Sequence, residues 1–273
     1  MSHYTVAVFT ENEGKTIDDL LAPFDENLEV EKYLSSTKTE FIEGKKKYYH
    51  DYATDGPYAE YIKDPEGYAK KYNDEAHLKY LREDFPKKLK YTDEEIWKNE
   101  TRYYDDDQIT EEGIWSTYNP KSKWDWYEIG GRWSNSLKLK DGRTVDSAPA
   151  KDVDITPDPN HVKRLERFWE LYVEGKKPET ESDKELIKFV FFKKEYYLNK
   201  YKTKEKYVEV ESAFHTWAAL TPDGEWLEPG QMGMFGMSDS TPIEEVLWVD
   251  KFKTIFKEAV KLNWNITIVD CHI

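Results

Sequence analysis

The final ten residues, WNITIVDCHI at 264–273, form an apolar and β-branched run that predicts a strand. They follow residues 242–262, which predict a long helix with a proline in its first turn and Thr241 or Ser240 as its N-cap. Residues 3–10, HYTVAVFT, are similar in composition and predict a first strand. Because a strand stands at each end of the sequence and a helix leads into the last one, we expect an α+β fold.

We expect a central, mostly antiparallel sheet that contains both strands, in a ferredoxin-like or related sandwich with helical insertions. Residues 29–110 crowd Tyr, Lys and Glu between proline-containing turns, which favours short helices over a sheet. Residues 157–205 carry two further helical patterns, at 157–175 and 182–202, whose apolar side chains are expected in the core. The sequence therefore predicts one α+β domain over 1–273, with 29–110 and 157–205 as helical insertions or subdomains.

Shorter patterns predict the remaining strands. Residues 207–220 alternate between apolar and polar side chains, as a strand does. Residues 136–139 and 143–145 flank Asp-Gly, which is a strong signal for a hairpin turn. Residues 125–129 are also expected to be extended.

The composition excludes several classes of protein. The chain has 273 residues with 10 Trp, 20 Tyr and 12 Phe. These aromatic side chains can bury a large apolar area, which argues against a disordered chain. One cysteine excludes an internal disulfide, and no apolar run approaches the length of about 18 residues that spans a bilayer. A net charge of −15 disfavours general affinity for nucleic-acid backbones. With no signal sequence in view, the cytoplasm is the expected compartment and no membrane partner is expected.

Residues 119–133, NPKSKWDWYEIGGRW, are the densest chemical feature. A glycine pair lets backbone N–H groups approach a ligand, Arg132 can donate two hydrogen bonds to a phosphate or carboxylate, and indoles can stack on a base. The alternative is that the tryptophans fill the core and Asp125 pairs with Arg132. On the first interpretation we expect one concave site whose ligand-binding residues are Lys123, Trp124, Asp125, Tyr127, Gly130, Gly131, Arg132, Trp133, Phe235 and His272.

Two further segments bear on that site. Residues 228–236, EPGQMGMFG, are either a tight structural connection or a flexible wall, and we expect the loop at 230–236 to form the rim. In the final strand, alternation places Asp270 and His272 on one face and Cys271 on the other. We therefore expect His272 to point toward the site and Cys271 to lie in the core.

Metal chemistry has little support in the sequence. His3 and His215 stand on predicted strands and could be imagined beside Asp270 and His272, but no HExxH or paired CxxC motif supports a metal site. We expect no metal and no cofactor. There is also no GxSxG elbow, no P-loop and no GxGxxG after a strand.

Three blocks carry a resemblance to a known family. KWDWYEIGGRW at 123–133, GEWLEPGQMGMFG at 224–236 and IVDCHI at 268–273 resemble the motifs of a widespread, uncharacterised family of bacteriophage-encoded proteins. With the first strand, the resemblance covers about a third of the chain. The sequence departs from the family pattern at Met234-Phe235, where a Trp-rich pair is expected. The resemblance implies an accessory role in the cytoplasm of an infected bacterial host, and it implies no reaction.

Three functions follow as hypotheses. The first is a phage accessory protein that binds a small nucleotide-like ligand, which could sequester a host immune signal and so counter defence. The second is an enzyme that hydrolyses a nucleotide-type signal, with His215 or His272 as general acid or base. The third is an acidic protein-binding inhibitor or DNA mimic that acts on a host defence protein. All three hypotheses are compatible with a homo-oligomer.

Overall fold

The computed structural model describes residues 2–273, apart from the side chain of Met234. The chain forms two compact units. Unit 1 comprises the chain up to Leu28 together with Asn119–Ile273, and unit 2 comprises Glu29–Tyr118. Among the described residues, no helix combines the length and the apolar character that crossing a bilayer requires.

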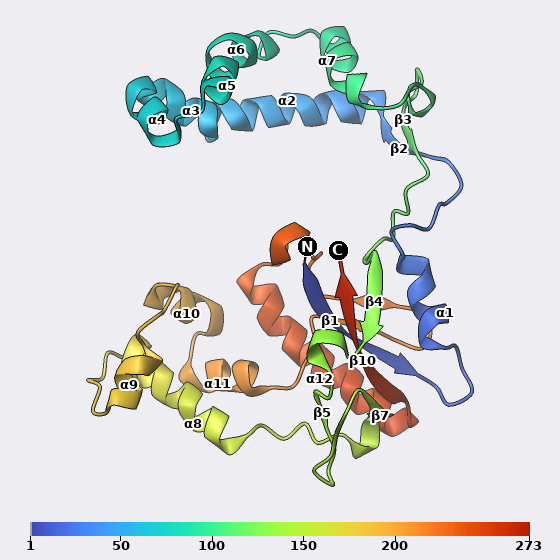
Figure 1. The fold of residues 1–273 in the computed structure, drawn as a ribbon, viewed down its shortest axis with the longest axis vertical. Coiled ribbons are helices and arrows are strands. Elements are labelled where there is room, and N and C mark those ends of the chain that lie inside the picture. The colour runs from blue at the N-terminus through green and yellow to red at the C-terminus, as the bar shows by residue number, and fades with distance from the viewer. Residues whose placement is uncertain (1) are drawn as a thin grey trace. The chain divides into compact units, whose positions relative to one another are not determined.

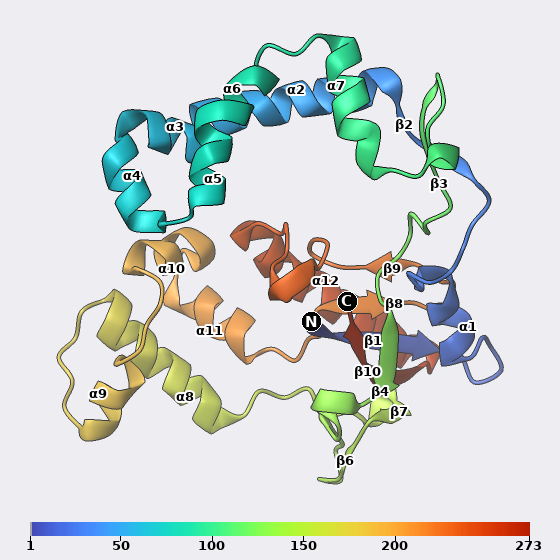
Figure 2. The same cartoon turned by 45° about the horizontal axis from the view of Figure 1, so that its top comes forward.

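A mixed six-stranded sheet forms the centre of unit 1 (Figure 1), so the α+β expectation is confirmed. Strands β1 (His3–Thr10) and β10 (Asn265–His272) pair antiparallel along their whole length, which confirms that both terminal strands lie in this sheet. Figure 2 shows the strand order β9-β8-β1-β10-β4. The sheet is mixed because β1 runs parallel to β8, whereas the other ladders are antiparallel. The further strands are β4 (Trp126–Ile129), β7 (Ser147–Pro149), β8 (Ala218–Leu220) and β9 (Trp226–Leu227).

A helix covers each face of the sheet. Helix α12 (Pro242–Leu262) begins with a Thr241 capping box and ends at Asn263 in the left-handed conformation, so the predicted helix is confirmed. Its buried Trp248 and Phe252 pack with Phe9 and other residues of one sheet face. Helix α1 (Ile17–Leu21) packs against the opposite face, where Val6 and Cys271 lie. We call these the α12 face and the α1 face.

The predicted Asp-Gly turn joins a small hairpin, β5 (Leu137–Lys138) with β6 (Thr144–Val145). Gly142 has φ of 88°, which a glycine adopts without strain. Short helical turns complete this part of unit 1: η1 (Ala22–Phe24), η5 (Gly131–Trp133), η6 (Ala150–Asp152) and η8 (Met234–Gly236).

Two expectations for the helical segment of unit 1 are wrong. The helix expected at 182–202 breaks at 187–193, where Phe189 and Phe191 are 79% and 95% exposed instead of buried. The strand expected at 207–220 begins as a helix and reaches β8 only at Ala218, because Thr203 caps the helix and Tyr207 and Val210 pack on Trp169. The helices of this segment are α8 (Pro159–Phe168), η7 (Trp169–Val173), α9 (Glu181–Leu186), α10 (Lys194–Tyr201) and α11 (Lys204–Ser212).

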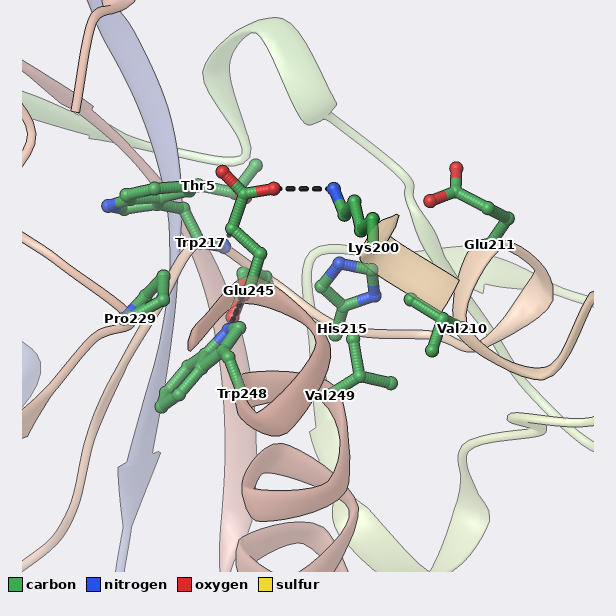
Figure 3. A pocket seen from close by; sticks show the side chains of 11 residues that line it. Thr5, Lys200, Val210, Glu211, His215, Trp217, Pro229, Glu245, Trp248 and Val249 are labelled. Carbon is green, nitrogen blue, oxygen red and sulfur yellow. Dashed lines mark hydrogen bonds and ion pairs between the residues drawn. The ribbon is translucent and has the colours of Figure 1, made fainter. Parts of the chain in front are cut away.

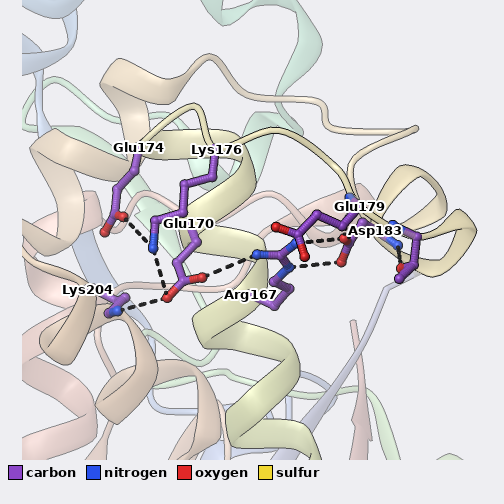
Figure 4. A network of polar contacts seen from close by, with 8 residues as sticks. Arg167, Glu170, Glu174, Lys176, Glu179, Asp183 and Lys204 are labelled. Carbon is purple, nitrogen blue, oxygen red and sulfur yellow. Dashed lines mark hydrogen bonds and ion pairs between the residues drawn. The ribbon is translucent and has the colours of Figure 1, made fainter.

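An ion-pair network, which we call the Arg167 network, ties α8 to α9 (Figure 4). Arg167 donates two hydrogen bonds to Asp183, from Nε to Oδ1 (2.9 Å) and from Nη2 to Oδ2 (2.7 Å). The same carboxylate accepts the backbone N–H groups of Glu179 and Thr180. These bonds, that of Arg167 foremost, hold the pKa of Asp183 well below its usual range. Every oxygen of this carboxylate is therefore occupied.

Unit 2 is mainly helical, as expected, although its first helix is longer than predicted. Ile42 and Tyr49 on that helix pack with Phe85 and Ile96, and a second cluster gathers around Leu81. The elements are β2 (Tyr33–Thr37), α2 (Lys38–Thr54), α3 (Pro57–Lys63), α4 (Pro65–Tyr72), α5 (Glu75–Lys79), η2 (Tyr80–Asp84), α6 (Phe85–Lys88), α7 (Asp93–Glu100), η3 (Thr101–Tyr103), η4 (Asp106–Gln108) and β3 (Gly113–Ser116). Strands β2 and β3 pair with each other.

Candidate functional site

The segment at 123–133 lies alongside the final strand. Strand β4 pairs with β10, so that Trp126 stands opposite His272 and Glu128 stands opposite Asp270. The backbone N–H of Asp125 donates to the carbonyl of His272 (3.0 Å). This ladder brings part of the predicted site next to the final residues of the chain.

Five side chains form what we call the histidine–aspartate cluster: His3, Asp125, Trp126, Asp270 and His272. Nδ1 of His272 is hydrogen-bonded to Oδ1 of Asp125, and Nδ1 of His3 lies 2.9 Å from Oδ1 of Asp270. The two imidazole centroids are 4.9 Å apart. The Trp126 indole stacks on His272 at 5.3 Å and is 43% exposed. Two carboxylate–imidazole pairs thus lie beneath one partly exposed aromatic ring.

The pairing of His272 determines its tautomer. An ionised carboxylate only accepts hydrogen bonds, so Nδ1 of His272 donates its proton to Asp125 and the neutral ring keeps its lone pair on Nε2. That Nε2 atom is buried and has no hydrogen-bond partner among the residues that the structure describes. Unpaired buried polar atoms are rare and destabilising in folded proteins. The free nitrogen therefore marks His272 as a candidate acceptor or base.

Asp270 organises the other half of the cluster. It is 1% exposed, and its second oxygen, Oδ2, accepts the backbone N–H of Arg132 (3.0 Å). Gly131 makes this approach possible: its φ is 48°, and a Cβ atom there would lie 2.5 Å from Cβ of Asp270. The close backbone approach that the glycine pair allows thus serves a carboxylate of the chain itself. Gly130 adjoins it with φ of 73°, and a Cβ atom there would meet Asp146.

The remaining predicted residues of this segment do not converge with His272. Trp124 and Tyr127 belong to the α1 face, where Nε1 of Trp124 donates to the carbonyl of Leu21 (3.2 Å). Tyr127 donates to Asp18, and burial followed by that hydrogen bond raises the pKa of Tyr127 to about 12. The expected set is therefore divided between the two faces of the sheet.

The charged members of the segment have other neighbours than expected. Nζ of Lys123 lies 2.6 Å from Oε1 of Glu228. The Arg132 side chain is exposed, and the alternative pairing of Asp125 with Arg132 is wrong because Asp125 bonds His272. Trp133 is half-buried against the core of the α12 face.

The loop at 230–236 lies near the start of β1. The backbone N–H of Gly236 donates to Oγ of Ser2 (2.6 Å), one residue before His3. Phe235 is 77% exposed and has φ of 63°, which is uncommon for a residue with a side chain. Its ring is thus displayed on the surface.

Cys271 lies in the core, as predicted. It is fully buried on the α1 face, opposite to Asp270 and His272. Burial, followed by the charge of Asp270, raises the pKa of the thiol. The thiolate that a nucleophilic cysteine requires is therefore disfavoured here.

A cavity of about 250 Å³, which we call the His215 pocket, opens on the α12 face (Figure 3). Its wall contains an ion pair in which Nζ of Lys200 lies 2.5 Å from Oε2 of Glu245. Burial alone would lower the pKa of Lys200, but the hydrogen bond and charge of Glu245 outweigh burial and raise it. The side chains that carry chemistry here are Thr5, Lys200, Glu211, His215, Trp217 and Glu245.

His215 is oriented like the cluster histidines. Its Nδ1 lies 2.9 Å from the carbonyl oxygen of Ala213, and because a carbonyl only accepts, Nδ1 carries the proton and Nε2 keeps the lone pair. Figure 3 shows its ring beside the Lys200–Glu245 pair. The sequence indicated His215 as a candidate acid or base, whereas Lys200 and Glu245, which lie on α10 and α12, were not among the expected site residues.

Thr5 connects the pocket to the cluster. Its hydroxyl accepts the backbone N–H of Trp217 (3.1 Å), and its ladder partner in β10 is Asp270. Since side chains alternate along a strand, His3 and Thr5 lie on the same face as neighbours. The pocket and the cluster therefore adjoin along β1.

No group of three or more His, Cys, Asp or Glu side chains within residues 2–273 has the geometry to hold a metal ion. No protein-family model, curated protein or solved structure matches this chain. The resemblance to phage-encoded proteins therefore stays a prediction.

Proposed function

We propose that this is a phage accessory protein that binds a small nucleotide-like ligand in the His215 pocket and withholds it, as a host immune signal, from bacterial defence. The observation that carries the proposal is the composition of the pocket wall, which combines an indole, an imidazole and a partly buried ion pair around one cavity. We expect the protein to act in the bacterial cytoplasm. A ferredoxin-like or related sandwich stays a prediction for the fold.

Each part of the wall suits one part of such a ligand. Trp217 lines the cavity, and an indole is a side chain on which a base can stack. Glu211, Glu245 and Nε2 of His215 can accept hydrogen bonds from amino or hydroxyl groups, and Lys200 can contact an anionic group. The cavity of about 250 Å³ is just below the range of about 300–1,000 Å³ that is usual for drug-sized ligands. We therefore expect it to accept a single nucleoside-sized portion.

A second candidate function, hydrolysis of a nucleotide-type signal, rests on the imidazoles. His215 and His272 each have Nδ1 bonded to an oxygen acceptor, which leaves Nε2 as the basic nitrogen. An imidazole held in this way is suited to general acid or base catalysis. The Nε2 atom of His272 is buried, so in the pocket this role would fall to His215.

The deciding experiment is to incubate the protein with a bacterial nucleotide pool, remove unbound material, denature the protein and identify what is released. Sequestration predicts an unchanged ligand, and hydrolysis predicts a converted one. Release of no small molecule, together with an unchanged nucleotide pool in the unbound material, would overturn both and favour the protein-binding inhibitor.

Variants assign the ligand to the pocket. His215→Ala and Glu245→Gln should each reduce the amount retained, whereas His50→Ala, at an exposed histidine of unit 2, should not. Equal retention by all three variants would place the ligand elsewhere.

A further inference from the structure

Unit 2 contains its own cavity, of about 410 Å³, which we call the tyrosine–lysine pocket. Its wall includes Tyr80, Lys87, Lys88, Tyr91, Arg102 and Tyr103. We propose that this pocket is a second binding site, for a small anionic ligand that carries a planar ring, such as a nucleoside monophosphate. The inference does not rest on the function proposed for unit 1, because every residue of the wall belongs to unit 2.

One cation of the wall is held in place. Nζ of Lys88 lies 2.7 Å from Oε1 of Glu100 and 5.6 and 5.9 Å from the ring centroids of Tyr49 and Tyr80. The hydroxyl of Tyr49 donates to the same carboxylate (2.7 Å). Burial alone would raise the pKa of Glu100, but the hydrogen bonds from Lys88 and Tyr49 outweigh burial and lower it. Glu100 is therefore anionic near neutral pH and positions the Lys88 ammonium at the cavity.

Two more cations stand at the wall with their charge available to a ligand. Lys87 and its partner Asp84 have side chains that are 65% and 54% exposed, so their ion pair is weak and readily exchanged. The guanidinium of Arg102 lies 4.6 Å from the ring centroid of Tyr103. A phosphate brought between Lys87, Lys88 and Arg102 would meet donors of matching charge.

The tyrosines of the wall can stack on the planar ring of a ligand. Tyr80, Tyr91 and Tyr103 line the cavity, and aromatic faces stack on bases of any identity. Burial, followed by the neighbouring tyrosines, raises the pKa of Tyr80 to about 12. Its phenol is thus neutral at pH 7 and can donate to an anion. A cavity of about 410 Å³ is within the usual range of about 300–1,000 Å³ for small-ligand sites.

Isothermal titration of the full chain with AMP, adenosine and inorganic phosphate tests this site. AMP should bind more tightly than either of its parts, and added NaCl should weaken AMP more than adenosine. Arg102→Ala and Lys87→Ala should each raise the Kd for AMP about tenfold or more, as expected for loss of a charge-assisted hydrogen bond. Both side chains are at the surface, so these variants should fold, which a thermal melt verifies.

Matched controls separate this site from general charge and from unit 1. Arg82→Ala and Lys90→Ala remove exposed cations that are not part of the wall and should leave the Kd unchanged. His215→Ala should also leave this binding event unchanged, so failure of the function proposed for unit 1 can be told apart from failure here. Equal affinity for AMP and phosphate, equal effects of the wall and control variants, or no binding of AMP would overturn the proposal.

Discussion

The Arg167 network and the histidine–aspartate cluster are both built on buried carboxylates, yet they differ in how completely their polar atoms are paired. Asp183 in the network accepts from Arg167 and from two backbone N–H groups. In the cluster, Asp270 is similarly occupied, but Nε2 of His272 is buried without a partner in the described structure.

This difference separates a structural role from a functional one. A fully paired network gains its hydrogen bonds on folding and leaves nothing for a ligand. An unpaired buried nitrogen decreases stability, and such features are found where activity rather than folding determines the residue. The comparison predicts that the paired members of the cluster support the fold while the His272 ring does not.

The largest effect is expected at Asp270. Asp270→Ala removes the acceptor for the His3 ring and for the Arg132 backbone N–H, and leaves both donors unpaired at a position that is 1% exposed. We expect the free energy of unfolding to fall by about 3 kcal/mol, since an unsatisfied buried group costs roughly 1–3 kcal/mol. Urea denaturation measures this. A variant as stable as wild type would show that Asp270 is not a structural centre of the cluster.

A somewhat smaller loss is expected at Gly131. Gly131→Ala forces a side chain into a left-handed conformation and brings its Cβ against Asp270. Strain of this kind costs about 1–3 kcal/mol. Gly142→Ala is the control, because its φ of 88° is also positive but its added Cβ would meet open space. If both variants lost the same stability, the contact with Asp270 would contribute nothing.

His272→Phe should alter stability least within the cluster. Phenylalanine keeps a ring against Trp126 and removes the unpaired Nε2, while Asp125, whose side chain is 30% exposed, can turn to water. We expect the free energy of unfolding to stay within about 1 kcal/mol of wild type, because removing an unsatisfied polar atom offsets the lost bond to Asp125. Urea denaturation measures this. A loss of several kcal/mol would show that His272 supports the fold after all.

The smallest effect concerns acid stability of the Arg167 network. The pKa of Asp183 in the folded protein is lowered, so its contribution to stability is present above the unfolded value of about 3.9 and is lost as pH falls further toward the folded value. Asp183→Asn should remove this part of the acid sensitivity. Urea midpoints of wild type and variant, compared at pH 7 and pH 3, should differ less at pH 3. An equal difference at both pH values would contradict the assignment.

Local signals in the sequence determined much of the framework. The strands at His3–Thr10 and Asn265–His272 and the helix Pro242–Leu262 follow from composition, caps and periodicity, which act between residues near one another in the chain. Strand alternation likewise determined that Cys271 faces the core and that Asp270 and His272 share the other face. The same local rules gave wrong predictions in two places. At 187–193 the helix breaks and Phe189 and Phe191 are exposed, and from Tyr207 to Ser212 packing against Trp169 favours a helix over a strand.

Only the tertiary structure decided which groups meet. His3 pairs with Asp270 across 267 residues and His272 pairs with Asp125 across 147. They meet because the register of β1, β10 and β4 sets His3 and Trp126 opposite His272, which brings His3 near Asp270 and Asp125 near His272. Tertiary packing also places Trp124 on the α1 face and brings Lys200 and Glu245 together at the His215 pocket. A residue's type and spacing determine its chemistry and the face it occupies, but its partner depends on strand register and helix docking, which no short stretch of sequence contains.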